Sequence, residues 1–155
     1  MNACNLRIKN VLGTVKEEFD KAVPMSTKVR MLELRKKPAL WKEICKALYR
    51  IPSARKVDRD DLIQELGDSI GNNDVGYVGL DLTLEEMKRE GYIVDLGGSE
   101  NYVLTKEGAK VVEVNHAFEE EIVPPISEII IKECELQGIK HDRGSAESLI
   151  YEAIK

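Results

Sequence analysis

The chain of 155 residues has no long apolar run and only three cysteines, Cys4, Cys45 and Cys134. Because its longest purely apolar runs are only a few residues, the sequence predicts no membrane span. The N-terminal segment MNACNLRIKN has no continuous apolar stretch, so a secretory signal is not expected. An odd number of cysteines, spaced far apart, indicates a reducing compartment. We therefore expect a cytoplasmic protein.

Residues that carry catalysis or bind metals are also scarce. His116 and His141 are the only histidines, and no CxxC or HxxxH spacing occurs. The glycines at 71, 76 and 79 lack the lysine and hydroxyl residue that end a phosphate-binding loop, so we expect them to turn the chain before a helix. Aromatic residues make up only 5% of the chain, too few for a platform that stacks single-stranded bases. The sequence thus predicts no catalytic residue, no metal site and no cofactor, and we do not expect an enzyme.

What the chain does contain is a globular proportion of apolar residues and an uneven distribution of charge. Hydrophobic residues account for 43% of the sequence, and the length favours one compact domain spanning 1–155. Residues 1–57 carry 14 Lys and Arg against five Asp and Glu, whereas residues 58–155 carry nine against 23. A basic segment of this kind suggests a polyanionic partner. The alternative is that the two halves pack together and neutralise each other.

Apolar spacing and capping residues predict four helices in the first part of the chain. A stripe at 3.6-residue spacing predicts a helix over about 5–22. Ser26 is a suitable N-cap for a second helix, whose inner face would include Val29. Pro38 is expected to be the first residue of a third helix, and Asp58 to cap a fourth.

The last part of the chain also reads as helical. A helix that starts after Thr105 is expected to be broken by Pro124-Pro125, and Ser145 is expected to cap a last short helix. Between them, the helix 126–137 has apolar residues on more than one face, so it needs burial on more than one side. The second side could be covered by a partner subunit or by the first helix of the same chain, and we favour a partner subunit.

The stretch 80–112 combines a helix, a hairpin and a second helix in close succession. Three apolar side chains lie on one face of a helix expected over 80–90: Leu80, Leu84 and Met87. Gly91 should end that helix, since glycine adopts the left-handed cap without a Cβ penalty. Two short extended runs, Tyr92–Val94 and Tyr102–Leu104, flank a Gly-Gly turn at 97–98, and Thr105 can cap the next helix.

This order resembles the winged helix-turn-helix superfamily of bacterial and archaeal transcription regulators. In that family an apolar pattern matching 80–93 precedes the wing, and the pattern Leu-Thr-Lys-Glu-Gly, here Leu104–Gly108, follows it. The resemblance implies a mainly α fold, with a winged helix-turn-helix core over about 39–114 that carries a small antiparallel β-wing. Helices within 5–37 and 115–155 would flank this core. Such flanking helices commonly build a two-fold dimer in that family, so we expect a homodimer.

The resemblance also implies a DNA-binding transcriptional regulator with double-stranded DNA as its partner. Phosphates are contacted by Lys and Arg, and base edges are read by the exposed face of one helix. The DNA-contact candidates lie around the turn before the second helix of the winged core and on the helix 80–90: Arg50, Arg55, Lys56, Arg59, Thr83, Lys88 and Arg89.

Carboxylates interrupt this expected DNA face. The helix 80–90 carries Asp81, Glu85 and Glu86, and the wing tip 95–101 has two acidic residues but no Lys or Arg. Several carboxylates together repel phosphates. Two alternatives therefore stay open. One is a winged-helix protein–protein interaction module, or subunit of a larger assembly, without DNA binding. The other is a ligand-sensing regulator with a pocket between the flanking helices and the winged core.

Overall fold

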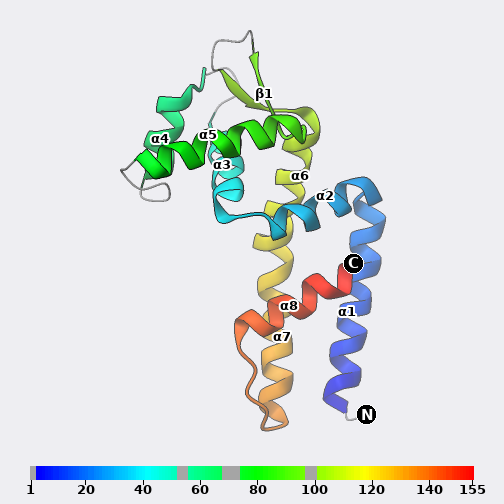
Figure 1. Cartoon of the computed structure of the whole chain (residues 1–155). Helices are drawn as coiled ribbons and strands as arrows, with labels where there is room; N and C mark the ends of the chain where they lie inside the picture. The colour runs from blue at the N-terminus through cyan, green and yellow to red at the C-terminus, as the bar shows by residue number, and fades with distance from the viewer. Residues whose placement is uncertain (1–2, 52–55, 68–73, 97–100) are drawn as a thin grey trace. The chain divides into compact units, whose positions relative to one another are not determined.

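The computed structural model describes residues 3–51, 56–67, 74–96 and 101–155 (Figure 1). These residues are mainly helical, with one two-stranded antiparallel sheet. The chain divides into two compact units, whereas its length favoured a single compact domain over 1–155. Unit 1 comprises Met1–Leu32 and Val114–Lys155, and unit 2 comprises Glu33–Glu113, close to the central region expected over 39–114. None of the helices in this described part of the chain is long and apolar enough to cross a membrane.

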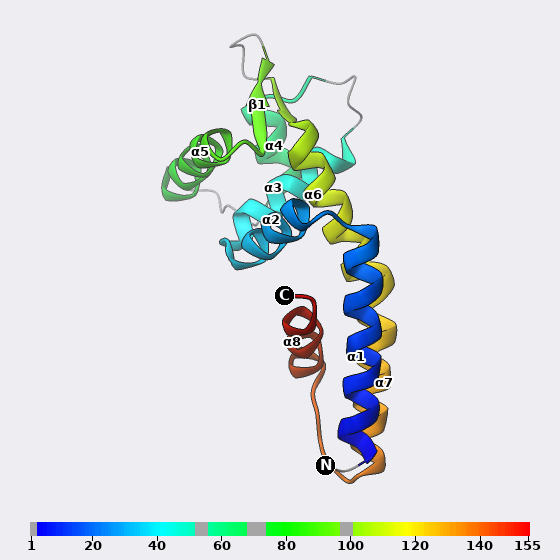
Figure 2. The same cartoon turned by 90° about the vertical axis from the view of Figure 1, so that its right-hand side faces the viewer.

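Unit 1 contains α1 (Ala3–Ala22), α7 (Val123–Leu136) and α8 (Arg143–Ile154). All three pack against one another, and α1 runs alongside α7 (Figure 2). The core is joined by three aromatic rings: Phe118 meets both Phe19 and Tyr151 edge to face, with ring centroids 5.2 Å apart in each pair. Apolar stripes at helical spacing thus produce a three-helix core in which both neighbours of α7 come from the same chain.

The helical path that begins with α6 continues through the two prolines that were expected to end it. α6 (Lys106–Ala117) leads into a π-helical segment, η3 (Phe118–Ile122), which leads directly into α7. Proline lacks an amide hydrogen and clashes with the carbonyl four residues earlier. In the wider π turn the amide of Val123 donates to the carbonyl of Phe118, and Pro124 and Pro125 occupy the first turn of α7. The predicted break was therefore wrong.

Two predicted helix starts in unit 1 also need correction. α2 (Met25–Lys36) begins one residue before Ser26, because the amide of Lys28 already bonds to the carbonyl of Pro24, and Val29 is exposed instead of facing inward. α8 is capped by Asp142, whose carboxylate accepts a hydrogen bond from the Ser145 amide at 2.7 Å. Both Asp and Ser are good caps, and the cap lies three residues earlier than predicted.

Unit 2 packs three helices and a hairpin around one core. α3 (Ala39–Arg50) contacts α4 (Arg59–Leu66), α5 (Asp74–Arg89) and strand β2 (Tyr102–Leu104). Strand β1 (Ile93–Asp95) pairs antiparallel with β2, with Val94 opposite Val103. The predicted hairpin is confirmed, although its turn at 97–98 lies outside the described residues. The predicted inner face of α5 is also confirmed, since its three apolar residues, Leu80, Leu84 and Met87, are each at most 2% exposed.

Local sequence signals fix the ends of α5 and α6. Gly91 has a φ of 82°, its amide bonds to the carbonyl of Lys88, and the amide of Tyr92 bonds to the carbonyl of Met87. These two bonds form the Schellman motif that ends α5, as predicted. The Thr105 hydroxyl oxygen accepts from the amide of Gly108 at 2.9 Å and its hydrogen is donated to the Gly91 carbonyl at 2.6 Å. Thr105 therefore caps α6 and ties it to the end of α5.

α5 is longer than expected. It begins at Asp74 and not at Leu80, so Gly76 and Gly79 lie inside the helix and do not turn the chain before it. Glycine costs about 1 kcal/mol relative to alanine in a helix interior, but each residue added to an existing helix also gains a backbone hydrogen bond. The buried side chains of Leu80, Leu84 and Met87 anchor the later turns of α5.

Candidate nucleic-acid interface

The predicted DNA-contact residues belong to unit 2. Arg50 is the last residue of α3, and Arg59 is the first residue of α4, whose start is fixed by a capping box between Asp58 and Asp61. This box confirms the predicted cap at Asp58. Thr83 and two further candidates, Lys88 and Arg89, lie on α5. Lys56 is exposed just before α4, whereas Arg55 lies outside the described residues.

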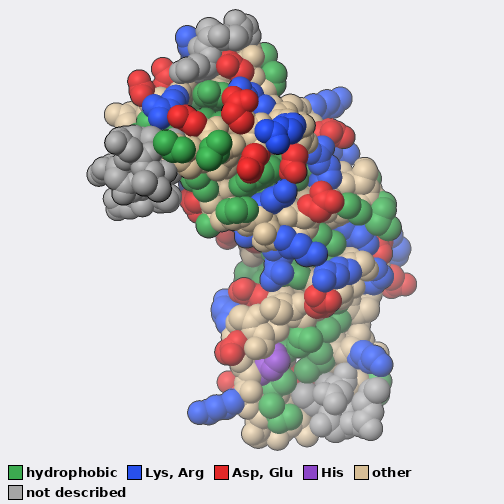
Figure 3. Space-filling model, viewed as in Figure 1, with side chains coloured by type: hydrophobic (Ala, Val, Ile, Leu, Met, Phe, Trp, Pro, Cys, Tyr) green, Lys and Arg blue, Asp and Glu red, His purple; other side chains and the backbone are tan. Residues whose placement is uncertain are grey.

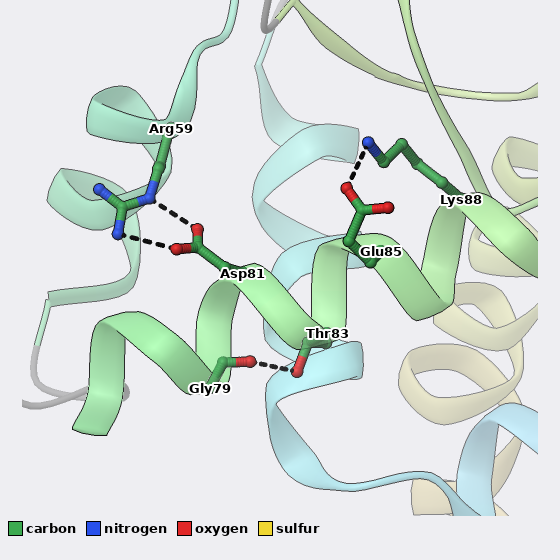
Figure 4. Close-up of polar contacts among 6 residues, drawn as sticks. All are labelled: Arg59, Gly79, Asp81, Thr83, Glu85 and Lys88. Carbon is green, nitrogen blue, oxygen red and sulfur yellow. Dashed lines mark hydrogen bonds and ion pairs between the residues drawn. The ribbon is translucent and has the colours of Figure 1, made fainter. Parts of the chain in front are cut away.

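The best-defined interaction on this surface joins α4 to α5 through Arg59 and Asp81 (Figure 4). The Arg59 guanidinium donates two hydrogen bonds to the Asp81 carboxylate, from Nε to Oδ1 at 2.7 Å and from Nη2 to Oδ2 at 3.2 Å. The side chains are 31% and 52% exposed, respectively. Two parallel bonds hold the planar guanidinium against the carboxylate, the geometry with the highest directional specificity among ion pairs. Arg59, one of the predicted phosphate contacts, is thus already paired with a carboxylate.

Two other candidate cations also lie next to carboxylates, each through a single recorded approach. Arg50 lies 3.9 Å from a carboxylate oxygen of Glu65, and Lys88 lies 2.7 Å from one of Glu85. The hydrogen bond that Lys88 donates to the Glu85 carboxylate raises the pKa of Lys88 above its ordinary value. Lys88 also lies 6.0 Å from the ring centroid of Tyr102 on β2. Exposed pairs of this kind contribute about 0–1 kcal/mol each, so a phosphate can displace them.

Lys56 and Arg89 differ from these cations. Both are exposed, and within the described ranges neither makes an ion pair or a hydrogen bond through its side chain. The Thr83 hydroxyl donates a hydrogen bond to the carbonyl of Gly79, one helical turn earlier, at 2.7 Å (Figure 4). Of the candidates in the structure, Lys56 and Arg89 are therefore the cations most readily available to a phosphate.

The exposed face of α5 is mixed in character, not uniformly basic. Val78 and Leu82 are 56% and 61% exposed, and they lie one turn apart among exposed carboxylates. Figure 3 shows acidic, basic and apolar side chains interleaved over this part of unit 2. Neither exposed apolar residue was predicted from the sequence, although their spacing, out of phase with the buried stripe at 80, 84 and 87, was the available signal.

The charge split along the sequence is not a split between the units. Unit 2 carries 13 Lys and Arg against 16 Asp and Glu, and unit 1 carries 10 against 12. Each unit draws on both halves of the chain, and in unit 1 the basic α1 reaches the acidic α7 through Arg7 and Glu133 at 3.0 Å. This arrangement favours the alternative that the two halves neutralise each other.

A cleft of about 430 Å³ lies beside the Arg59–Asp81 pair. It is lined by side chains of α4, α5 and β2: Arg59, Asp81, Leu84, Glu85 and Tyr102. The cleft is open to solvent and polar, so a phosphate or the edge of a base can approach both members of the pair.

Cys45 is a buried cysteine of α3. Burial raises the pKa of the Cys45 thiol to about 12, which keeps it protonated and unreactive at neutral pH. Over the described ranges, no three His, Cys, Asp or Glu residues are grouped closely enough to hold a metal ion.

Comparisons of the chain with models of known protein families, with characterised proteins and with solved structures found no match.

Proposed function

We propose that unit 2 is a winged helix-turn-helix domain and that the protein is a DNA-binding transcriptional regulator. The observation that carries this proposal is the packing of α3, α4, α5 and the β1–β2 hairpin around one core. The segment before α4 extends this arrangement, since Tyr102 donates its amide to the carbonyl of Val57 at 2.8 Å. Val57 in turn donates its amide to the side chain of Asn101 at 3.1 Å. An extended segment between the first two helices, lying along the hairpin, fits a wing sheet.

The proposal assigns the first phosphate contacts to Lys56 and Arg89. Both are exposed cations without an ion-pair partner in the described residues, and they lie at the start of α4 and the end of α5. A cation that meets a phosphate releases a condensed counterion, which makes binding depend on salt. The paired cations Arg50, Arg59 and Lys88 would contribute only after exchanging a carboxylate for a phosphate.

The experiment is a titration of mixed-sequence duplex DNA at about 50 and 200 mM salt. The double variant Lys56→Ala/Arg89→Ala should bind roughly tenfold or more weakly at low salt, because each charged contact contributes about 1 kcal/mol or more. Its salt slope should fall by about two units, one for each phosphate contact. The matched control, Lys9→Ala/Lys132→Ala, removes the same charge from exposed positions in unit 1 and should leave both quantities unchanged.

A second candidate function is supported by the exposed face of α5. Val78 and Leu82 expose apolar surface between the carboxylates of Asp81, Glu85 and Glu86, a composition suited to a basic, partly apolar protein segment. If the unmodified protein shows no salt-sensitive binding to duplex DNA, the regulator proposal fails. The protein-contact module then becomes the leading function, with this face as its binding surface.

The proposal includes a homodimer, which would present two winged units to two DNA half-sites. Its support comes from Leu6 and Leu136, whose side chains are 53% and 78% exposed close to the Arg7–Glu133 pair between α1 and α7. The apolar second side of α7, from which a dimer was expected, does not support the homodimer. That side is covered by α1 and α8 of the same chain, and Ile130 is fully buried there.

Sedimentation tests this part of the proposal. The unmodified protein should sediment as a dimer at micromolar concentration, and Leu136→Asp should convert it to a folded monomer, because a charge at the interface would lose its hydration. A monomer for the unmodified protein would contradict the dimer. Ile130 is not a suitable probe, since a charge at this fully buried position would unfold the chain.

A further inference from the structure

We infer that Asp81 determines the sequence selectivity of the α4–α5 surface by keeping Arg59 away from DNA phosphates until a matching base engages the carboxylate. This inference rests on the proposed function. Within the described residues the only hydrogen bonds and ion pair of the Asp81 side chain are those with Arg59, at 2.7 and 3.2 Å.

The geometry makes phosphate and carboxylate compete for the same donors. Arg59 presents Nε and Nη2 to the two oxygens of Asp81, and a phosphate accepts from a guanidinium in the same bidentate manner. A phosphate that takes the Nε–Nη2 edge of Arg59 must therefore replace the carboxylate there, and it leaves Asp81 facing the polyanion without this pairing. On DNA of arbitrary sequence, a phosphate contact to Arg59 therefore costs the Arg59–Asp81 pair, and binding through the DNA backbone alone is weakened.

A matching sequence can remove that penalty. Asp81 is half exposed and lines the cleft with Glu85, so a base edge can reach its oxygens. A carboxylate accepts a hydrogen bond from the exocyclic amino group of cytosine in the major groove, and from no acceptor-only edge. When cytosine takes the place of the guanidinium, Arg59 is released to a phosphate. The carboxylate and the guanidinium then both have partners, so base recognition and phosphate binding occur together.

The same helix provides a matched control. Glu86 is an exposed carboxylate on α5, like Asp81, but its side chain has no partner among the residues that the structure describes. Asp81→Asn and Glu86→Gln each remove one negative charge from the same helix. A general loss of repulsion would affect both variants equally, whereas release of Arg59 would affect only Asp81→Asn.

The first measurement is the affinity for mixed-sequence duplex DNA. Asp81→Asn should bind about fivefold more tightly than Glu86→Gln, the factor that corresponds to an exposed ion pair of about 1 kcal/mol. Its salt slope should be steeper by about one unit, since one further phosphate is contacted. In an Arg59→Ala background the gain from Asp81→Asn should disappear. Thermal unfolding of each variant verifies that the compared proteins are folded, and Asp81→Ala provides a second variant at the same position.

The second measurement is selection from a random duplex library. The unmodified protein should enrich sites with cytosine at one defined position, and Asp81→Asn should lose that preference while keeping the others. Equal gains for Asp81→Asn and Glu86→Gln, a gain that persists without Arg59, or an unchanged cytosine preference would each overturn the role of Asp81 and leave the proposed function standing. If neither the unmodified protein nor any variant shows salt-sensitive binding, the proposed function fails and this inference fails with it.

Discussion

Unit 1 and unit 2 both join their helices through aromatic rings that meet edge to face. In unit 1, Phe118 connects Phe19 with Tyr151, and in unit 2, Trp41 meets Tyr92 with ring centroids 5.6 Å apart. Their ion pairs are distributed differently. Those of unit 1 include pairs that link α1 to α7 and α7 to α8, whereas three pairs of unit 2 involve the residues that sequence analysis assigned to DNA contact.

This difference separates the role of the charges from that of the core. Exposed ion pairs contribute little to stability, so the fold of each unit depends mainly on buried apolar and aromatic side chains. Under the proposed function, the pairs in unit 2 would instead decide which cations a DNA phosphate can reach. Surface charge in unit 2 is therefore informative about function, and core packing in both units is informative about stability.

The largest effect is expected when the edge-to-face ring contacts that both units contain are removed. Phe118→Ala in unit 1 and Trp41→Ala in unit 2 should each lower the free energy of unfolding by about 3–5 kcal/mol, because each removes a nearly fully buried ring and leaves a cavity. Urea denaturation measures the change. Leu82→Ala, at an exposed position of α5, is the control and should change stability by about 0.5 kcal/mol or less. A small effect of either ring removal would show that the ring contacts are not central to that unit.

A smaller effect distinguishes two glycines within helices. A Cβ at Gly108 in α6 would collide with the backbone carbonyl of Tyr92, whereas a Cβ at Gly13 in α1 would meet nothing within 4 Å. Gly108→Ala should therefore destabilise the protein by about 1–3 kcal/mol through overpacking. Gly13→Ala should stabilise it by about 0.5–1 kcal/mol through lower backbone entropy in the unfolded chain. Thermal unfolding of both variants gives the signs, and equal signs would contradict the close packing of α6 against the end of α5.

The smallest effect concerns the two aspartate caps, Asp58 of unit 2 and Asp142 of unit 1. Backbone hydrogen bonds, from Asp61 and Ser145 respectively, hold the pKa of each carboxylate below its ordinary 3.8. A carboxylate with a lowered pKa in the folded state stabilises the fold above about pH 4 and loses that contribution as the pH falls through the lower, folded pKa. The unfolding free energies of unmodified protein and Asp58→Asn should therefore differ at pH 7 and converge in acid.

Asp142→Asn should show the same convergence. Asp58→Ala removes the hydrogen-bond acceptor as well as the charge, so its difference from the unmodified protein should persist at low pH. Denaturation curves between pH 7 and pH 2 test both statements, and a difference for Asp58→Asn that does not change with pH would contradict the assigned cause of the shift.

The sequence allowed prediction of those features that depend on neighbouring residues. The caps at Asp58 and Thr105, the glycine that ends α5 and the paired strands all follow from short local patterns, and the structure confirms them. The start of α5 and the passage through Pro124-Pro125 were predicted wrongly. In both cases a helix continues from a neighbouring segment: α5 passes through glycines, and α7 follows a π turn. The preferences of single residues do not reveal such continuation.

The candidate site was predictable only as a set of residue types. Arg59 and Asp81 were predicted separately, as a candidate cation and an interrupting carboxylate. They are 22 positions apart, and their pairing requires the first residue of α4 to approach α5. The exposure of Leu82 likewise depends on which face of α5 is buried. Tertiary contacts therefore decide which of the predicted charges remain available.

Amide hydrogen exchange with and without duplex DNA tests most directly whether unit 2, and not unit 1, is the DNA-binding part of the chain. At low salt and saturating duplex, exchange should slow in α5 (Asp74–Arg89) and in the β1–β2 hairpin, where groups become covered by DNA. Exchange in α8 (Arg143–Ile154) should not change. Slowed exchange confined to unit 1, or no change anywhere at a DNA concentration that saturates binding, would contradict the assignment of DNA binding to unit 2.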